Sequence, residues 1–354
     1  MQREMHAVVM DRFGPSSVLE YRTVVVQSPS PDEVVIEVGA VSVNRTLDIS
    51  VRNNGDGRPV QLPHVLGVDP SGVIVEMGNA VSGFHRGDRV AVLATRCGQC
   101  DSCRAGRRCE RQFHPGVERW GGYAEYITVP AWTLLPLPDN IAFAEATVIL
   151  RHYPTAHHLL GVVARVSPGE RVLILGAAGG LGSAATEVAL RLGAEVIAGA
   201  GANERVEAGI SRGASAGINY REEDLTRRVM ELTGDEGVDV LVENIGEPNL
   251  WSAAFLCVGR EGRVVTAGAH GGGTVALDVR RLYQYRISIL GSNGRTDQDI
   301  EWVLAQHRAK PFNPLIGAVM PLAEARLAHD LVERNAITGK IVLDPRSSSS
   351  TPIP

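Results

Sequence analysis

The fold of this chain is decided by residues 172–182, which read Val-Leu-Ile-Leu-Gly-Ala-Ala-Gly-Gly-Leu-Gly. The four apolar residues predict a strand buried on both faces, the glycines a tight turn, and the run 183–189 a helix. Such a turn directs unpaired backbone N–H groups at one point, where the helix dipole favours an anion. The spacing Ala177-x-Gly179-x-x-Gly182 matches the dinucleotide-binding fingerprint with alanine in its first position. We therefore predict a pyrophosphate site here; the alternative is a purely structural glycine turn.

Length and composition exclude several classes of protein. A chain of 354 residues is expected to form two domains, and 44% hydrophobic residues with a net charge of −5 are typical of a globular protein. The basic residues are scattered and outnumbered by acidic ones, so no nucleic-acid partner is expected. Residues 1–14 lack the apolar core of a signal peptide, and no run approaches the ~20 apolar residues that cross a bilayer. These features predict a cytoplasmic protein without a membrane segment.

The rhythm of predicted elements changes at about residue 141. Before it, short β-like runs alternate with Gly/Pro/Asp turns and predict a small antiparallel barrel, with strands at 6–10, 33–38, 72–76 and 89–93. After it, strands separated mostly by helical segments predict a doubly wound parallel sheet. Those six strands are expected at 171–175, 195–198, 216–219, 238–242, 263–267 and 287–290. A last strand is expected at 339–343, followed by a polar tail.

Together these pieces resemble the medium-chain dehydrogenase/reductase superfamily, and within it the quinone oxidoreductase and enoyl reductase branch. The motifs that carry the resemblance are residues 176–182, Pro63–Asp69, Gly121–Tyr126, Asn219–Asp224 and Gly339–Leu343. The resemblance implies an α/β protein with a GroES-like β-barrel catalytic domain at 1–140 and a Rossmann NADP-binding domain at 141–293. It implies a C-terminal segment at 294–354 that returns to the catalytic domain. It also implies a homodimer or homotetramer acting on a small-molecule substrate.

Four of the five cysteines, Cys97, Cys100, Cys103 and Cys109, fall within thirteen residues. In a reducing compartment such a cluster predicts a metal site, and a closed set of four sulfurs is typical of structural zinc. The resemblance implies the same, because the superfamily has a zinc lobe that begins Cys-Gly-x-Cys-x-x-Cys. The gap to the fourth cysteine is five residues here, against the usual seven, so a vestigial cluster of reduced thiols is the alternative. Cys257 stands alone in an apolar segment and is expected in the core.

The resemblance also locates the three ligands of the catalytic zinc in alcohol dehydrogenases of this superfamily. Those positions hold Asn44, Val68 and Arg151 here. An amide, a valine and an arginine cannot form such a zinc site, so zinc-assisted alcohol oxidation is not expected. Nearby histidines lack the paired spacing of ligands and are expected at the surface or in hydrogen bonds; they are His64, His152, His157 and His158.

Without a Lewis acid, hydride transfer needs an acceptor that is already polarised by conjugation, such as a quinone or an α,β-unsaturated carbonyl. Thr46 is the candidate catalytic hydroxyl, because the superfamily places a relay hydroxyl two residues after the first ligand position. Its relay histidine is replaced by Ile49. Tyr153 is the other candidate acid, with a packed aromatic side chain as the alternative. Arg45 matches an arginine that contacts the pyrophosphate, unless it is a plain surface residue. Asp48 and Asp69 are expected to support or cap the site.

The second strand of the predicted sheet is not followed by the carboxylate that NAD-preferring sites use to hold the ribose. Arg205 and Tyr220 match the phosphate-contacting residues of NADPH-dependent relatives, so NADP(H) is the predicted cofactor. Glu204 could instead hold a ribose. The resemblance implies further cofactor contacts at Asn44, Arg45, Thr155, Ala178, Gly179, Gly180, Leu181, Gly182, Asn244, Gly268, Ser292 and Asn293.

The sequence is compatible with three hypotheses about function. The leading one is an NADPH-dependent reductase of a conjugated acceptor with one structural Zn²⁺. The alternatives are an alcohol dehydrogenase that acts without catalytic zinc and a crystallin-like nucleotide-binding protein with weak catalysis. The resemblance implies that variable loops such as 50–62 and 110–120 line the cleft and select the substrate.

Overall fold

The computed structural model describes residues 3–93, 97, 99–105, 109–110 and 114–349, and the backbone of 351–352. The chain forms two compact units. Unit 1 comprises residues 1–151 and 316–354, and unit 2 comprises residues 152–315. Helix α3 (Phe143–His157) contains the first boundary and β15 (Ile316–Pro321) follows the second, so both lie further along the chain than the predicted limits of 141 and 293.

Unit 2, all of which is described, contains a six-stranded sheet in which every pair of neighbours is parallel. Its strands in spatial order are β11 (Ala216–Asn219), β10 (Glu195–Ala200), β9 (Arg171–Leu175), β12 (Val238–Val242), β13 (Val258–Thr266) and β14 (Ser288–Gly291). This order, in which the first strand lies between the second and the fourth, is that of a doubly wound fold. Its central strand β9 is buried on both faces, which explains its unbroken apolar run.

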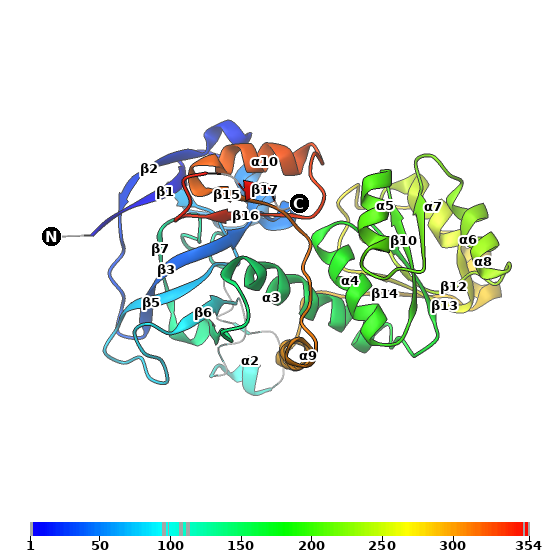
Figure 1. Ribbon diagram of the computed structural model, residues 1–354, viewed down its shortest axis with the longest axis horizontal. Coiled ribbons are helices and arrows are strands. Elements are labelled where there is room, and N and C mark those ends of the chain that lie inside the picture. The colour runs from blue at the N-terminus through cyan, green and yellow to red at the C-terminus, as the bar shows by residue number, and fades with distance from the viewer. Residues whose placement is uncertain are drawn as a thin grey trace. The chain divides into compact units, whose positions relative to one another are not determined.

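Helices cover both faces of this sheet (Figure 1). α4 and α5 lie on one side and α6, α7 and α8 on the other. Each is short, and several begin at a side-chain cap, such as Asp224 before α6 and Glu247 before α7. The helices of unit 2 are α4 (Gly180–Arg191), α5 (Asn203–Ile210), α6 (Leu225–Thr233), α7 (Pro248–Leu256), α8 (Val279–Tyr285) and α9 (Asp297–Ala309), with the π-helical turn η5 (His158–Val163).

Unit 1 is built around β3 (Glu33–Ser42), a long and almost fully buried strand. One edge of β3 pairs with β5, while its other edge pairs first with β7 and then with β16. Among the described residues the larger sheet has eight strands: β3, β5 (Ser71–Met77), β6 (Arg89–Val92), β7 (Tyr126–Pro130), β8 (Leu134–Pro136), β15, β16 (Lys340–Asp344) and β17 (Thr351–Pro352). A smaller sheet holds β2 (Glu20–Val25), β1 (Glu4–Met10) and β4 (His64–Val65).

The C-terminal residues therefore complete the sheet of unit 1, because β16 pairs with the end of β3 through Val342 opposite Ser42. The helical segments of unit 1 are η1 (Ser16–Val18), η2 (Arg45–Ile49), α1 (Ser50–Asn54), η3 (Gly55–Gly57), α2 (Asp101–Arg104), η4 (Ala131–Thr133), most of α3, η6 (Leu322–Glu324) and α10 (Ala325–Glu333). No helix among the described residues is long and apolar enough to cross a membrane.

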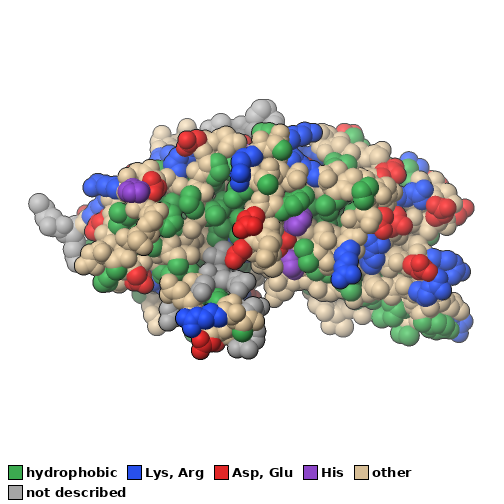
Figure 2. Space-filling model, turned by 90° about the horizontal axis from the view of Figure 1, so that it is seen from below, with side chains coloured by type: hydrophobic (Ala, Val, Ile, Leu, Met, Phe, Trp, Pro, Cys, Tyr) green, Lys and Arg blue, Asp and Glu red, His purple; other side chains and the backbone are tan. Residues whose placement is uncertain are grey.

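The predicted architecture is present: a unit of largely antiparallel β-sheets is combined with a doubly wound parallel sheet. The strand β13 is longer than the predicted 263–267, because it begins at Val258 and passes through a register irregularity opposite β12. Residues Gly259–Gly262 of β13 have the composition of a turn, so the first half of this strand was not predicted. On the face shown in Figure 2, basic and acidic side chains are interspersed, as their scattered positions in the sequence suggest.

Candidate functional site

The glycine-rich segment of unit 2 forms the turn that the sequence predicts. Gly176 follows β9 with φ +69°, and α4 begins at Gly180 without a side-chain cap. A Cβ on Gly182 would lie 2.1 Å from the Gly176 carbonyl oxygen, so only glycine lets α4 pack this close to the strand. The first N–H groups of α4 have no intrahelical acceptor, which leaves them suited to an anion. The turn follows β9, whose neighbours in the sheet are β10 and β12. The strand order reverses at this point, and ligands of such sheets bind there.

Most of the predicted cofactor-binding residues lie at the same edge of the sheet, which we call the nucleotide edge. It consists of the residues that follow the carboxyl ends of the parallel strands, and it includes Ala178–Gly182, Arg205, Tyr220, Asn244, Gly268, Ser292 and Asn293. Asn244 is buried, and its Oδ1 accepts a hydrogen bond of 2.7 Å from the Ala267 N–H. The Ser292 N–H donates to the Thr266 carbonyl, which ties the ends of β13 and β14 together.

Glu243 is a residue of this edge that the sequence analysis missed. It is 1% exposed, and its carboxylate accepts hydrogen bonds from the N–H groups of Ile245 and Gly246. Burial raises the pKa of Glu243, although these N–H groups act in the opposite direction. An acid at the end of an apolar strand was the signal that could have revealed it.

A second group of polar residues is buried in unit 1. We call it the buried polar centre, and it consists of Ser42, Asn44, Asp48, Asp69 and Lys340. The Asn44 Nδ2 donates to Asp69 at 2.9 Å and to the Ser42 hydroxyl at 3.2 Å, while its Oδ1 accepts from the Lys340 Nζ at 2.8 Å. The side-chain amide of Asn44 is therefore engaged on both its oxygen and its nitrogen.

The charges of the buried polar centre act on one another. Burial, together with the charge of Asp69, raises the pKa of Asp48, although its carboxylate accepts from the N–H groups of Asn44 and Gly67 at 2.8 and 3.0 Å. Burial lowers the pKa of Lys340, whereas Asp69 and Asp48 favour its charged form. The Lys340 ammonium thus interacts electrostatically with two buried carboxylates, while its hydrogen bonds go to the Asn44 side chain and the Val43 carbonyl.

A buried hydrogen-bond chain extends from Asp48 through Tyr123 and His329 to Arg52. The Arg52 guanidinium can only donate, so His329 accepts at Nδ1 over 3.1 Å and carries its proton on Nε2, which lies 3.0 Å from the Tyr123 hydroxyl. Because the Tyr123 hydroxyl accepts from His329, its own hydrogen is available to the Asp48 carboxylate. Burial and the neighbouring charge of Arg52 lower the pKa of His329 to about 3, and burial raises that of Tyr123 well above its usual value. All three links of the chain therefore orient their hydrogens toward Asp48.

The two candidate catalytic residues have very different surroundings. Thr46 is exposed and lies in the turn η2, which the Asp48 carboxylate closes by accepting from the Asn44 N–H. Tyr153 is fully buried in unit 2, where its hydroxyl donates to Glu187 at 2.7 Å and its ring contacts Phe312. Burial and the charge of Glu187 raise the pKa of Tyr153. This setting favours the alternative interpretation of Tyr153 as a packed aromatic residue.

Other predicted residues also have partners within their own unit. The Arg45 guanidinium donates to the Val332 carbonyl and to the Asn335 side chain at the end of α10. Thr155 is half-buried on α3. The Nδ1 atoms of His157 and His158 lie 2.7 and 2.9 Å from the carboxylate of Asp299. His64 is buried, which lowers its pKa, and His152 is half-buried.

The four clustered cysteines converge in unit 1 as the sequence predicts, and we call them the cysteine lobe. Their sulfur atoms all lie within 4.8 Å of one another, with Cys97 and Cys103 at 4.0 Å and Cys100 and Cys109 at 3.9 Å. Four ligands at the usual Zn–S distance of about 2.3 Å would be about 3.8 Å apart. Backbone N–H groups, first that of Cys103, lower the pKa of Cys100 to about 6 and so favour the thiolate that a metal needs. Residues 94–96, 98, 106–108 and 111–113 lie outside the described residues.

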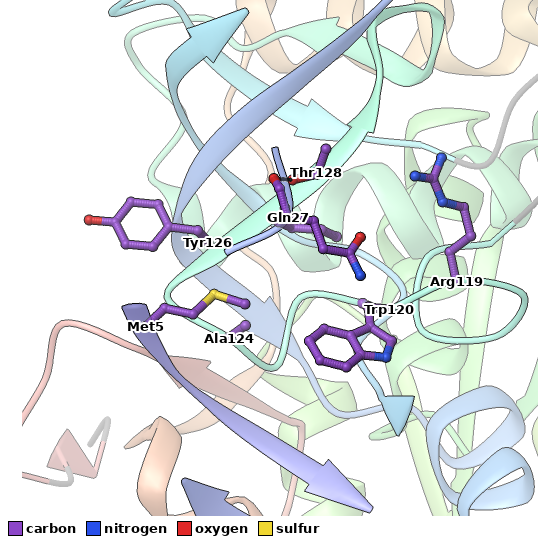
Figure 3. Close-up of a pocket in the computed structure, with 9 residues that line it drawn as sticks. Met5, Gln27, Arg119, Trp120, Ala124, Tyr126 and Thr128 are labelled. Atoms are coloured by element: carbon purple, nitrogen blue, oxygen red, sulfur yellow. Dashed lines mark hydrogen bonds between the residues drawn. The ribbon is translucent and has the colours of Figure 1, made fainter. Parts of the chain in front are cut away.

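The described surface of unit 1 also has a small pocket beside β1 and β7 (Figure 3). Trp120 and Arg119 line it, but the Trp120 Nε1 donates to the Pro63 carbonyl and Arg119 pairs with Glu33. None of the predicted site residues is among its lining, so it does not define the candidate site.

Comparison with known proteins places this geometry in a family. The alcohol dehydrogenase GroES-like domain matches residues 30–139, and the zinc-binding dehydrogenase family matches residues 180–308. A quinone oxidoreductase of Rattus norvegicus is 30% identical over 350 residues, which are 97% of this chain and 98% of that protein. The chain belongs to the medium-chain dehydrogenase/reductase superfamily.

Alcohol dehydrogenases of this superfamily are similar as well. An NAD-dependent alcohol dehydrogenase of Sulfolobus acidocaldarius is 28% identical over 349 residues, which are 96% of this chain and 99% of that protein. A crystal structure of an NAD-dependent alcohol dehydrogenase is 35% identical, covers 96% of this chain and 99% of its own, and has a TM-score of 0.89. The predicted superfamily is confirmed, and the protein is an oxidoreductase. The cysteine lobe fits the structural zinc of a medium-chain dehydrogenase/reductase.

Proposed function

We propose that the protein is an NADPH-dependent reductase of conjugated acceptors, such as quinones or α,β-unsaturated carbonyl compounds, that works without a catalytic zinc. The observation that carries this proposal is the buried polar centre. At the three positions where zinc alcohol dehydrogenases have their ligands, this chain has Asn44, Val68 and Arg151. The amide of Asn44 is held by Lys340 and Asp69, so an internal ammonium supplies the positive charge at this place. The similarity to quinone oxidoreductases agrees with this chemistry.

The reaction adds a hydride and a proton to the acceptor. Bound NADPH supplies the hydride, which conjugation directs to the electrophilic carbon. The electron pair of the broken π bond moves to the oxygen, and a hydrogen-bond donor must steady the charge there. We assign this role to the exposed hydroxyl of Thr46, because Tyr153 is buried and already donates to Glu187. The solvent or Thr46 then supplies the proton.

The cofactor preference rests on the end of β10. No carboxylate follows Ala200 directly; Gly201 follows instead, and a Cβ on Gly201 would lie 3.3 Å from the Tyr220 hydroxyl. Arg205 lies in the first turn of α5 and acts electrostatically on Tyr220. A 2′-phosphate would meet a guanidinium and a phenol here, and both are suited to a dianion.

We further propose one structural zinc, held by Cys97, Cys100, Cys103 and Cys109, and a homodimer or homotetramer. The exposed edge strand β14 with its apolar residue Ile289, and the exposed apolar residues Val279 and Tyr283 of α8, support association with a second copy.

The test is to follow the oxidation of NADPH with a panel of quinones, enones, enoyl thioesters and simple aldehydes. We expect turnover with a conjugated acceptor and little with aldehydes. Thr46→Val should lower turnover ~10²–10³-fold while the affinity for NADPH is unchanged, because it removes one donor to the developing charge. Tyr153→Phe, the matched loss of a hydroxyl, should leave turnover almost unchanged. A protein that reduces simple aldehydes faster than every conjugated acceptor would contradict the proposal.

A second candidate function is an alcohol dehydrogenase that acts without catalytic zinc. The similarity to the crystal structure of an NAD-dependent alcohol dehydrogenase favours it. Oxidation of primary or secondary alcohols with NAD⁺, faster than any reduction in the panel, would support this candidate instead.

A further inference from the structure

The ends of β10 and β11 lie side by side at the nucleotide edge. The two strands are parallel, and Ala200 is the register partner of Asn219. The residue after Ala200 is Gly201, and those after Asn219 are Tyr220 and Arg221. Strand pairing therefore brings Arg221 to the place where a sheet of this kind meets the adenosine end of a dinucleotide.

The Arg221 guanidinium lies over the backbone of Gly201. A Cβ built on Gly201 would be 3.1 Å from the Arg221 Nε and 3.3 Å from the Tyr220 hydroxyl. The missing side chain of Gly201 thus makes room for both groups. The Tyr220 hydroxyl lies within the electrostatic reach of two arginines, Arg221 and Arg205, which oppose the rise in its pKa caused by burial.

The acidic residues that follow Arg221 are engaged elsewhere. Glu222 accepts a hydrogen bond of 3.1 Å from the Asn203 side chain. Glu223 accepts from the Asn219 N–H at 3.0 Å and pairs with Arg228 at 3.8 Å. These contacts engage both carboxylates that follow Arg221 with groups of α5, β11 and α6.

We propose that Arg221 is a second cation for the 2′-phosphate of NADPH and shares this specificity role with Arg205. The inference rests on the proposed cofactor preference and adds a residue that the sequence analysis did not single out. A phosphate monoester carries close to two negative charges at pH 7, so one guanidinium leaves part of its charge unmatched. The planar guanidinium can donate two parallel hydrogen bonds to phosphate, which lysine cannot do. NADH lacks this phosphate, so Arg221 contributes to the binding of NADPH only.

The experiment measures the dissociation constants of NADPH and NADH for the full-length protein by fluorescence titration, with 2′,5′-ADP as a competitor. The variants are Arg221→Ala, Arg221→Lys, Arg205→Ala and the double alanine variant. The control is Arg227→Ala, which removes a guanidinium from an exposed side chain of α6 that pairs with Glu231. We expect Arg221→Ala to weaken NADPH and 2′,5′-ADP about tenfold, because a charge-assisted hydrogen bond is lost. NADH binding and the control should change less than twofold, and Arg221→Lys should recover part of the loss.

The outcomes separate this inference from the proposed cofactor preference. If Arg205→Ala weakens NADPH and Arg221→Ala does not, the role of Arg221 is wrong and the preference stands. If Arg221→Ala weakens NADPH and NADH equally, Arg221 contacts a part common to both cofactors, and the inference is also overturned. If the unmodified protein binds NADH as tightly as NADPH, the preference itself fails and the role of Arg221 fails with it.

Discussion

Unit 1 contains two places that are built for positive charge, and they are built in opposite ways. The cysteine lobe brings together four sulfur atoms from one stretch of thirteen residues, at the distances that a tetrahedral metal requires. The buried polar centre brings together Asn44, Asp48 and Asp69 and places the ammonium of Lys340 against the Asn44 side chain. The cysteine lobe is suited to binding a metal ion, whereas the buried polar centre contains the side-chain cation of Lys340.

A side-chain ammonium and a metal ion differ in the chemistry that they can supply. An ammonium that is buried and bonded to the Val43 carbonyl and to Asn44 cannot exchange ligands as a metal does. It can hold Asn44 and the adjoining turn η2 in one geometry, and η2 carries the exposed Thr46. Under the proposed function, conjugation and hydrogen bonds activate the substrate, and a zinc in the cysteine lobe serves only the stability of the lobe.

The largest expected effect comes from removing the internal cation. Lys340→Met removes the buried ammonium whose charge interacts with Asp69 and Asp48, and leaving buried carboxylates without a counter-charge costs about 3–5 kcal/mol of the free energy of unfolding. Urea denaturation followed by circular dichroism measures this loss. The control is Lys310→Met, since Lys310 is exposed. Adding Asp48→Asn to Lys340→Met should recover part of the stability, because it removes one of the unmatched charges. A loss below 1 kcal/mol would show that Lys340 does not neutralise the centre.

Removing the proposed zinc of the cysteine lobe should lower the free energy of unfolding less, because only the lobe is stabilised by the metal. Elemental analysis should find close to one zinc per chain, and Cys103→Ser should abolish it. Chelation should increase proteolysis within residues 94–113 before activity falls, since the proposed zinc takes no part in the reaction. Two equivalents of zinc, or reversible inhibition by a chelator without loss of structure, would contradict the comparison between the two places.

The smallest expected effect on stability concerns the buried hydrogen-bond chain that runs from Arg52 to Asp48. Because the folded state lowers the pKa of His329 to about 3 from 6.5, its contribution to stability is complete above pH 6.5 and is lost as the pH falls toward 3. The slope of one such proton is about 1.4 kcal/mol per pH unit, so the protein should be about 2 kcal/mol less stable at pH 5 than at pH 7 through this group.

His329→Gln tests this effect, because glutamine can still accept from Arg52 and donate to Tyr123 but does not titrate. The variant should lack the slope, and His85→Gln should retain it, since the side chain of His85 is 87% exposed. Parallel pH profiles for the protein and for His329→Gln would refute the assignment.

Much of the fold follows from local sequence signals. Strands β9, β11 and β12 begin and end where they were predicted, since short apolar runs bounded by glycine and polar residues define their limits. β2 and β15 were missed because no residue of β2 is buried and only the last two of β15 are, so neither has the apolar run of a core strand. The convergence of the four cysteines was predictable because they are close in sequence and the lobe needs few long-range contacts.

By itself, the sequence determined the alternation of strands and helices and the glycine turn that can hold a pyrophosphate, and it predicted that Asn44, Val68 and Arg151 replace the ligands of a catalytic zinc. These are properties of residue type and spacing over short distances. Only the tertiary structure decided which groups contact Asn44, because Lys340 reaches it across 296 residues of sequence through the pairing of β16 with β3. It also decided that Tyr153 is buried against Glu187 and that Arg221 lies over Gly201, since sheet register and packing bring these groups together.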